Sequence, residues 1–412
     1  MNYKVLVLIL MGITFIFKTL EHYFEFKSAE RKIPANVADI YDANEYKRWA
    51  AYDKERNKLA LWRHLVSSLV SFLLIALDGY AAIVNLVGAE GLYSAALAFA
   101  VGDMVIDRIW STPFSYVKNM VIEQKYGFNT MTKKTFISDE IKDMIISLGW
   151  NCALVCIVIV LHQAMGNWLL ISLTAVILVI NIVGVFLQPV LVRVSNKLTP
   201  LEEGELRTRL TDLLVKNNCN VHQISVSDGS KRSTKANAFI SGLGKMKTIV
   251  LYDTLLEQMT GDEIVAVFAH EMGHNKNKDT IRLFFIAVWK ILLLIVLLWA
   301  VVSLPEVYKD FGFDGLNYGF AFELAGLGFG FISPLMDLLL NGMSRKFEYA
   351  ADKFAADNGY GEALISGLKN LEKNNFACLT PHPVVVALTY NHPVTSQRIE
   401  YIEKCMKNKE DK

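Results

Sequence analysis

Two histidines bracket a glutamate in the stretch His270-Glu271-Met272-Gly273-His274. In an α-helix, residues four apart lie on one face, so His270 and His274 could bind one tetrahedral zinc ion together. Glu271 would then lie beside the open coordination position, where it could take a proton from a zinc-bound water molecule. This spacing predicts a hydrolase with one Zn²⁺ ion, in which Glu271 is the general base.

The residues that precede this motif predict the helix that the chemistry needs. Thr260 and Glu263 are spaced as a capping box, and the apolar residues 264–268 follow directly. The competing interpretation is a capped core helix in which both histidines are structural. The sequence favours the zinc site because the motif and the helix signals coincide.

A catalytic zinc site normally has three protein ligands and one water molecule. Glu348 is the best candidate for the third ligand, and Asp352 follows four residues later on the same helical face. Asp352 could accept the second ring N–H of a zinc-binding histidine and so fix its tautomer. The alternative is a solvated acidic face with Arg345 and Lys346 as neighbours.

Two residues near the end of the chain could stabilise the oxyanion of a tetrahedral intermediate. His392 stands in Asn391-His392-Pro393, and Arg398 follows six residues after His392. Both side chains are hydrogen-bond donors of the kind that an oxyanion requires. Each of them, taken alone, is equally compatible with a structural role.

The composition is that of a membrane protein. Of the 412 residues, 53% are hydrophobic and only 20% are charged, and the mean hydropathy is +0.30. Residues 144–192 contain no Asp, Glu, Lys or Arg, which leaves room for two spans of about 20 residues separated near 163–167. The net charge of +1 gives no indication of a nucleic-acid partner. Five further spans are predicted near 4–24, 65–88, 92–110, 283–303 and 317–341.

The distribution of Lys and Arg predicts the orientation. These residues are frequent in 25–64, 111–143, 193–282 and after residue 342, whereas the short intervening loops contain only Lys309. Cytoplasmic loops near a membrane hold the basic residues preferentially. We therefore expect an outside N-terminus and a cytosolic protease domain. The five cysteines have neither zinc-finger spacing nor the context of a disulfide framework.

The predicted fold is mainly α-helical and multi-pass, with an α+β, zincin-like metalloprotease domain built from two segments. Its first segment should contain a helix over 200–216 and a small sheet with strands at 223–226, 238–240 and 248–251. The expected division is 1–192 for a membrane region with five spans, 193–282 for the first protease segment, 283–341 for two further spans and 342–412 for the second protease segment.

Several stretches together resemble the integral-membrane zinc metalloproteases of the CaaX prenyl protease type, the a-factor-converting family. Most of these stretches are weak signals alone, but their order along nearly the whole chain is specific. Besides residues 270–274, they are Glu-Tyr-Ala-Ala-Asp at 348–352, Glu-Gln-Lys-Tyr-Gly-Phe-Asn at 123–129, Glu-Gly-Glu-Leu-Arg at 203–207, Asp-Gly-Ser-Lys-Arg at 228–232, Asn-Ala-Phe at 237–239, and Asn-His-Pro at 391–393 with Arg398.

The resemblance implies a ring of about seven transmembrane helices around a large, water-filled intramembrane chamber that the zinc domain closes at its cytosolic end. The chain departs from the family at Lys235-Ala236, where members often show a His-Ser or similar pair. Carried over by residue, the resemblance implies His270, His274 and Glu348 as zinc ligands, Glu271 as the base, His392 and Arg398 as transition-state donors, and Asn237 and Ala238 as a backbone edge that aligns the substrate as an added strand.

Three hypotheses follow for the function. The first is a zinc endopeptidase that removes the last three residues of prenylated CaaX proteins, in the inner membrane of a prokaryote or the endoplasmic reticulum of a eukaryote. The second is a quality-control protease of the same chemistry that acts without prenyl dependence. The third is a membrane scaffold or transporter with structural zinc, which the presence of Glu271 argues against. The expected partners are the bilayer and a peptide or protein substrate, and the sequence leaves open whether prenylation is required.

Overall fold

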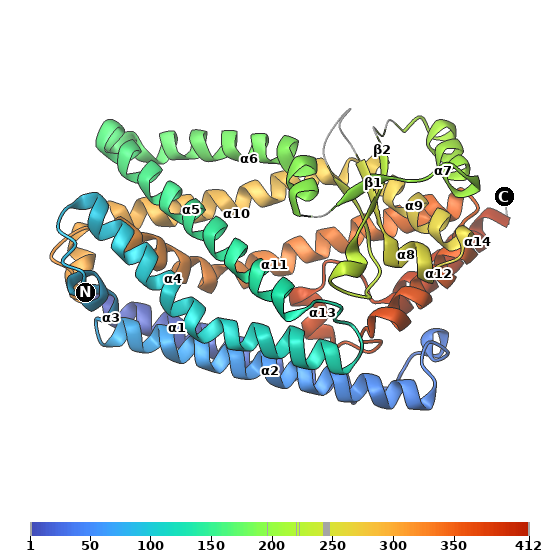
Figure 1. The fold of residues 1–412 in the computed structure, drawn as a ribbon, viewed down its shortest axis with the longest axis horizontal. Helices are drawn as coiled ribbons and strands as arrows, with labels where there is room; N and C mark the ends of the chain where they lie inside the picture. The colour runs from blue at the N-terminus through green and yellow to red at the C-terminus, as the bar shows by residue number, and fades with distance from the viewer. Residues whose placement is uncertain (1, 196, 220, 222, 242–247, 411–412) are drawn as a thin grey trace.

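The protein is elongated, and its long helices run along the longest axis of the molecule (Figure 1). The structure is a computed structural model that describes residues 2–410 apart from 196, 220, 222 and 242–247. The small sheet and most of the short helices lie at the end that carries the C-terminus, and the N-terminus lies at the opposite end (Figure 1). The two termini are thus separated by the full length of the long helices.

Seven long helices build the larger part of the described chain. Their apolar sequences explain why they form, and six of them fall within stretches long and apolar enough to cross a membrane. The seventh, α4, carries the charged residues Asp103, Asp107 and Arg108. The helices are α1 (Tyr3–Ser28), α2 (Ala43–Ala76), α4 (Leu92–Tyr116), α5 (Lys133–Met165), α6 (Leu169–Ser195), α10 (Asp279–Val302) and α11 (Tyr318–Asp357).

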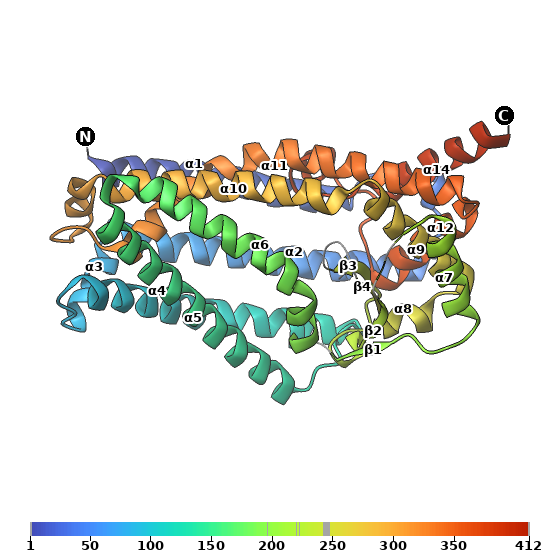
Figure 2. The same cartoon turned by 90° about the horizontal axis from the view of Figure 1, so that it is seen from above.

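Different helices form the two flanks of the bundle. Figure 2 shows α1, α10 and α11 side by side along one flank, and α4 and α5 along the other. At most 17% of the most apolar stretch of any candidate span is buried among the described residues. The bundle nevertheless has an apolar core, in which Ile75, Ile159 and Phe320 are fully buried. Cavities of about 750 Å³ and about 510 Å³ lie between its helices.

The predicted spans agree with helices at most positions, and the span predicted at 65–88 differs. The predicted break near 163–167 falls at a single turn of 3₁₀-helix, Gly166–Trp168. The span predicted at 65–88 is interrupted, because α2 ends at Ala76 and α3 (Gly79–Leu86) begins after Asp78, whose φ of 56° is left-handed. The Asp78 carboxylate accepts a hydrogen bond from Lys4 at 2.6 Å, which fastens this turn to α1.

The long N-terminal half of α2 was not expected from the basic and acidic residues of 25–64. It begins in a capping box, in which Asp42 accepts hydrogen bonds from the backbone of Asn44 and Glu45, and the Glu45 side chain accepts one from the Asp42 backbone. The spacing of Asp42 and Glu45 is the sequence signal that could have located this start. Trp49 on this half is buried against Leu379 and Ile399, so α2 braces the C-terminal segment.

A four-stranded sheet lies beside the protease helices in the order β1-β2-β4-β3. The central strands β2 and β4 are parallel, and the outer strands β1 and β3 are antiparallel to their neighbours. Pro200 belongs to β1, so the helix predicted over 200–216 begins only at Glu205. The strands are β1 (Leu198–Pro200), β2 (Gln223–Ser227), β3 (Ala238–Ser241) and β4 (Thr248–Tyr252).

The short helices enclose a second apolar core at this end of the molecule. Leu210, Ile249, Phe268 and Ile402 are fully buried in it. It therefore joins segments from both sides of the last two long helices into one unit. The short helices are α7 (Glu205–Lys216), α8 (Asp253–Gln258), α9 (Gly261–Lys276), α12 (Gly361–Asn375), α13 (Pro383–Thr389) and α14 (Thr395–Glu410).

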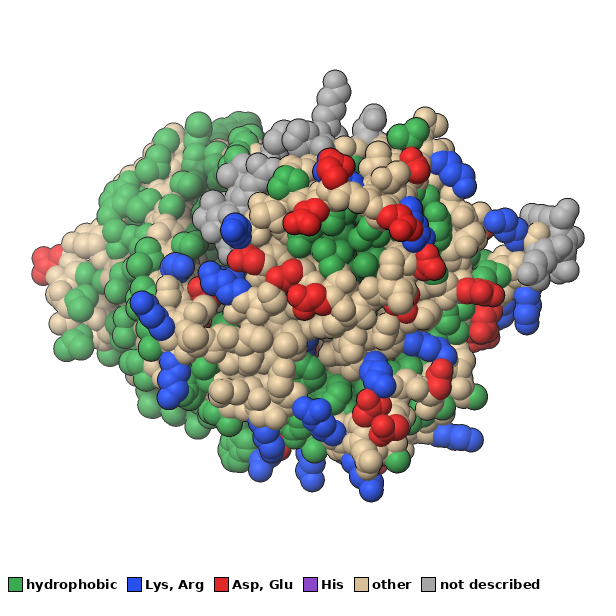
Figure 3. Space-filling view, turned by 45° about the vertical axis from the view of Figure 1, so that its right-hand side comes forward, with side chains coloured by type: hydrophobic (Ala, Val, Ile, Leu, Met, Phe, Trp, Pro, Cys, Tyr) green, Lys and Arg blue, Asp and Glu red, His purple; other side chains and the backbone are tan. Residues whose placement is uncertain are grey.

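The distribution of charge over the surface agrees with a membrane-embedded bundle. Figure 3 shows Lys, Arg, Asp and Glu gathered over the end that carries the sheet, whereas the part that recedes to the left is mainly hydrophobic. Charges inside the bundle are paired or face a cavity. Lys290 of α10 forms an ion pair with Asp337 of α11, and Asp103 and Glu323 line a cavity of about 160 Å³.

Candidate metal centre and active site

Helix α9 holds the His-Glu-Met-Gly-His motif, and the predicted capping box begins it. The Thr260 hydroxyl accepts a hydrogen bond from the Glu263 backbone at 3.3 Å, and the Glu263 carboxylate accepts one from the Thr260 backbone at 2.9 Å. Glu263 also accepts hydrogen bonds from Ser366 and Asn370 of α12. These contacts fix the start of α9 in the core.

A glycine in the motif sets the distance between α9 and α11. A Cβ atom added at Gly273 would lie 2.7 Å from the Cα of Ala351, closer than real Cβ atoms come to other atoms. Gly273 and Ala351 therefore allow the two helices to touch backbone to backbone. This contact places Glu348, one turn before Ala351, beside His270, one turn before Gly273.

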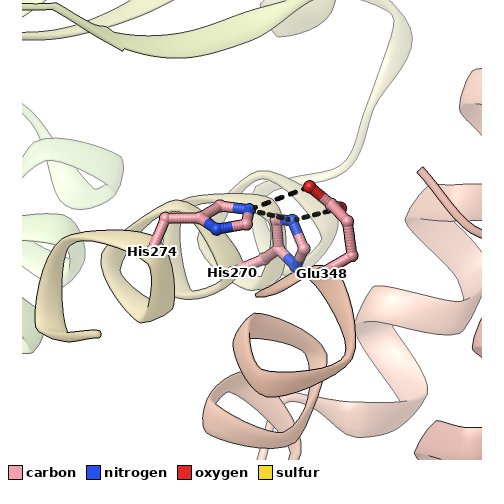
Figure 4. Close-up of side chains that lie close together, drawn as sticks. All are labelled: His270, His274 and Glu348. Atoms are coloured by element: carbon pink, nitrogen blue, oxygen red, sulfur yellow. Dashed lines mark hydrogen bonds and ion pairs between the residues drawn. The ribbon is translucent and has the colours of Figure 1, made fainter. Parts of the chain in front are cut away.

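The three predicted metal ligands converge at this contact (Figure 4). The Nε2 atoms of His270 and His274 are 3.2 Å apart. Glu348 Oε2 lies 3.4 Å from His270 Nε2, and Glu348 Oε1 lies 3.2 Å from His274 Nε2. His270 and Glu348 are buried and His274 is partly buried. Two imidazole nitrogens and one carboxylate that face one point form the donor set of a catalytic zinc site.

Each histidine is held from behind by a carboxylate. Asp352 Oδ1 accepts the Nδ1–H of His270 at 2.8 Å, as the sequence predicts for Asp352. Asp279 Oδ2 accepts the Nδ1–H of His274 at 3.0 Å. Both aspartates are buried. They select the tautomer that leaves Nε2 of each ring free to bind a metal.

Asp279 is a site residue that the sequence prediction missed. It is the first residue of α10, and the chain reaches it through Lys278, whose φ of 58° is left-handed. This reversal turns Asp279 back toward His274, five residues earlier. An acidic residue at the start of the next apolar run, just after the motif, was the available signal, but the reversal itself leaves no clear mark in the sequence.

Arg398 and His392 lie on different sides of the ligand group. Arg398 of α14 is buried, and its Nε and Nη2 donate to the two oxygens of Asp352 at 2.9 and 2.6 Å. Its Nη1 lies 3.8 Å from Glu348 Oε2. His392, in the loop before α14, is 56% exposed, and its Nδ1 lies 2.9 Å from Glu348 Oε2. Arg398 thus backs the site, whereas His392 is accessible at its rim.

The surroundings of one Glu348 oxygen show that these residues suit a metal ion. Glu348 Oε2 is buried and accepts no hydrogen bond of good geometry, although His270 and His392 lie nearby. A buried carboxylate oxygen without a hydrogen bond is costly, and a cation in front of it would remove that cost. The residues present therefore fit a divalent metal.

Without a metal ion, the carboxylates around His270 and His274 raise the pKa of both histidines. Burial lowers the pKa of His274, but hydrogen bonds to Asp279 and Glu348 outweigh this effect and raise it to about 10. Burial and the nearby Arg398 also lower the pKa of His270, and the carboxylates of Asp352 and Glu348 raise it on balance. A metal ion must displace these protons in order to bind.

Glu271 is partly exposed beside the ligands, as a general base must be. No described residue forms a hydrogen bond or an ion pair with its carboxylate. Burial raises the pKa of Glu271, and the neighbouring His270 and His274 oppose this shift only in part. A carboxylate with a raised pKa and free lone pairs is well suited to take a proton from water.

The outer strand of the sheet provides the predicted backbone edge. β3 pairs only with β4 among the described strands, so its second edge is free. Asn237 is exposed directly before β3, and its side chain accepts a hydrogen bond from the Ala238 backbone at 2.9 Å. Ala236 is held by Asn375 of α12, whose amide bonds both its N–H at 3.1 Å and its C=O at 3.3 Å.

Lys235, which stands where members of the family often have another residue, connects this edge to the membrane helices. Lys235 Nζ donates to Tyr52 and to Glu123, each at 3.0 Å. Glu123 opens the stretch 123–129, and Thr234 donates a backbone hydrogen bond to Phe128 of that stretch. The backbone just before β3 is therefore anchored to Tyr52 of α2 and to Glu123, the last residue of the π-helix that follows α4.

Comparisons with known proteins give the family and support the fold. The pattern of the CAAX prenyl protease N-terminal domain, with five membrane helices, matches residues 22–193, and that of peptidase family M48 matches residues 200–406. The CAAX prenyl protease 1 homolog of Oryza sativa subsp. japonica is 30% identical over 98% of both chains. The homolog of Arabidopsis thaliana is 36% identical over 74% of this chain and 73% of its own.

A crystal structure of S. mikatae Ste24p has the same fold, with a TM-score of 0.91 over 97% of this chain and 99% of that one, at 24% identity. The multi-pass, mainly α-helical architecture predicted from the sequence is thereby confirmed. The family match, together with the converging His270, His274 and Glu348, gives the chemistry. The chain belongs to peptidase family M48 and is an integral-membrane metallopeptidase of the CAAX prenyl protease type.

Proposed function

We propose that the protein is a zinc endopeptidase that cleaves prenylated CaaX substrates and releases their last three residues. The observation that carries the proposal is Glu271, a free carboxylate beside His270, His274 and Glu348. The names of its relatives, CAAX prenyl protease 1 homologs from rice and Arabidopsis, support the substrate class. The comparisons do not favour either a prenyl-independent quality-control protease or a scaffold with structural zinc.

One Zn²⁺ ion would be held by His270, His274 and Glu348. When bound, zinc supplies a Lewis acid that polarises the scissile carbonyl and makes water acidic. Nitrogen and carboxylate donors suit zinc, and three protein ligands leave one position for reactants. Asp279 and Asp352 keep the two imidazoles in the tautomer that binds.

The residues around the ligands carry out the proton transfers. Glu271 takes a proton from the attacking water and delivers it to the departing amine. His392, exposed at the rim, donates a hydrogen bond to the oxyanion of the intermediate. Two nitrogens of Arg398 donate to Asp352, and its Nη2 also lies 3.2 Å from His270 Nδ1, so we propose that Arg398 acts mainly by positioning Asp352 and His270.

The free edge of β3 would bind the substrate as an added strand. Backbone hydrogen bonds at Asn237 and Ala238 would hold an extended peptide in register, with its scissile bond at the metal. Asn375 supports this role because it fixes both backbone polar groups of the preceding residue, Ala236. The amide thus keeps the edge straight where the substrate enters.

We propose that the protease segments lie in the cytosol and the N-terminus on the other side of the membrane. The basic loops of the sequence and the position of the two termini at opposite ends of the bundle support this orientation. The host membrane is the inner membrane if the cell is prokaryotic and the endoplasmic reticulum if it is eukaryotic. The proposed division remains 1–192, 193–282, 283–341 and 342–412.

The test compares a fluorogenic peptide that ends in a farnesylated CaaX sequence with its unprenylated twin. Purified wild type, Glu271→Gln and Glu257→Gln are assayed, and the zinc content of each is measured. Glu257 is an exposed carboxylate of α8 and serves as the matched control. We expect equal zinc in all three, cleavage by wild type and Glu257→Gln only, and a faster rate with the farnesylated peptide. Equal rates on both peptides would refute the prenyl-dependent function.

A further inference from the structure

A polar cavity of about 750 Å³ opens between α2, α4 and α5, on the membrane side of the substrate-binding edge. Lys235, two residues before Asn237, belongs to its wall. So does the π-helix Val117–Glu123, which continues α4 for seven residues. π-Helical segments are rare and are frequently found at functional sites. The cavity therefore adjoins the point where a bound substrate would leave the end of β3.

The carboxylates of this cavity all have partners among the described residues, whereas two of its cations have none. Each of its carboxylates has a partner in the described chain, as Glu123 has in Lys235 and Asp143 has in Arg108. The others are Glu25 with His22, Asp107 with Ser111, and Glu140 with Arg108.

Two of its cations, in contrast, have no partner. Neither Arg63 of α2 nor Lys118 of the π-helix forms a hydrogen bond or an ion pair with any described residue. Both side chains are exposed. The cavity thus offers two free positive charges and no free negative one, which is the arrangement that binds an anion.

The direction of β3 shows which end of a substrate reaches this cavity. An antiparallel partner is the more stable choice for an added strand, and β3 itself already pairs in this way with β4. A peptide antiparallel to β3 runs from Ser241 toward Ala238, so its C-terminus points toward Lys235. If the scissile bond lies beside Ala238, three further extended residues span about 10 Å and carry the chain end toward Lys235.

We infer that Arg63 and Lys118 bind the free C-terminal carboxylate of the substrate. This inference rests on the proposed function, and it adds a basis for selecting cleavage sites three residues from a chain end. An arginine fork and a lysine point charge are the common partners of a carboxylate. The phosphate of a lipid headgroup has the same chemistry, so the experiment must separate the two sources.

The experiment titrates two farnesylated peptides, both ending in Cys-Val-Ile-Met, into the zinc-loaded Glu271→Gln protein in phosphatidylcholine nanodiscs. One peptide ends in a free carboxylate and the other in an amide. Because both cations are exposed, each contributes about a two- to fivefold preference, and together they contribute about 4- to 25-fold. Adding Lys118→Gln or Arg63→Gln should lower the preference two- to fivefold, about as far as an exposed ion pair allows, and raising the salt should lower it too.

Lys58→Gln is the matched control, because Lys58 is an exposed lysine of α2 outside the cavity lining. It should leave the preference unchanged. Equal affinity for the two peptides, or no binding of either, would overturn the inference, whatever the cleavage assay shows. Both substitutions could leave the preference intact, while phosphatidic acid competes with the peptide only in the Glu271→Gln protein that keeps both cations. This result would assign the cations to lipid phosphate and would also overturn the inference. Cleavage without a carboxylate preference would leave the proposed function standing alone.

Discussion

The substitution Gly273→Ala should weaken zinc binding strongly while it changes the free energy of unfolding only a little. The Cβ of Gly273→Ala would lie 2.7 Å from the Cα of Ala351, whereas ordinary contact begins at 3.4 Å. The helices must therefore move apart by about 0.7 Å, which exceeds the roughly 0.2 Å tolerance of metal–ligand distances. Because His270 and His274 lie on α9 and Glu348 lies on α11, this movement opens the ligand group along one side.

The effect on the free energy of unfolding should be small by comparison. Overpacking a tight contact costs about 1–3 kcal/mol, and replacing a helical glycine by alanine recovers up to about 1 kcal/mol. The net loss is then about 0–2 kcal/mol, which most proteins tolerate. Displacing a ligand should weaken zinc binding at least as much as removing a supporting carboxylate, which costs about 10- to 100-fold.

The assay is a competition between the purified protein and a chelator of known zinc affinity, with thermal unfolding in detergent measured in parallel. Gly149→Ala of α5 is the control, because its Cβ would meet nothing within 4 Å. It should keep the zinc affinity and unfold at the same or a slightly higher temperature. If Gly273→Ala kept both its zinc affinity and its cleavage rate, the argument that this contact sets the ligand geometry would be wrong.

Three further predictions follow from the contacts around the site. Asp279→Ala should lower zinc affinity about 10- to 100-fold in the chelator competition, because His274 loses the acceptor that fixes its tautomer. In zinc-free protein the pKa of His274 is raised from 6.5 to about 10, so protonated His274 stabilises the folded state. This stabilisation is complete below pH 6.5 and is lost as the pH rises through 10, so the unfolding temperature of the zinc-free protein should fall between these values. Asn375→Ala should raise KM with zinc content unchanged, because the edge at Ala236 loses two hydrogen bonds.

Local patterns in the sequence were enough to predict the features of the site that depend on one helix. The spacing of His270 and His274, and of Thr260 and Glu263, is a property of a single helix and survives in any fold that contains it. Glu348 could be proposed because a three-ligand zinc site needs one more donor. In each case the physical requirement is local or is a matter of counting ligands.

The parts that could not be predicted depend on contacts between distant segments. Asn375 reaches Ala236 across 139 positions of the chain, and nothing in either residue marks the pair. Arg398 could be proposed for the site, but only the packing of α14 shows that its guanidinium donates to both oxygens of Asp352. The half of α2 outside the membrane was mistaken for a loop region because its charges masked the capping box at Asp42.

The continuity of α11 links the metal centre to the membrane bundle. The helix runs unbroken from Tyr318 to Asp357, through the division that the sequence suggested at 342, over a length of about 60 Å. That is twice the roughly 30 Å of hydrocarbon, so one continuous helix carries both Asp337, paired with Lys290 in the bundle, and Glu348 at the metal. Because α9 passes into α10 through the two residues Asn277 and Lys278, the histidines are attached to the same pair of helices. A change in the relative position of α10 and α11 would therefore change the ligand geometry, which ties the metal centre to the membrane helices.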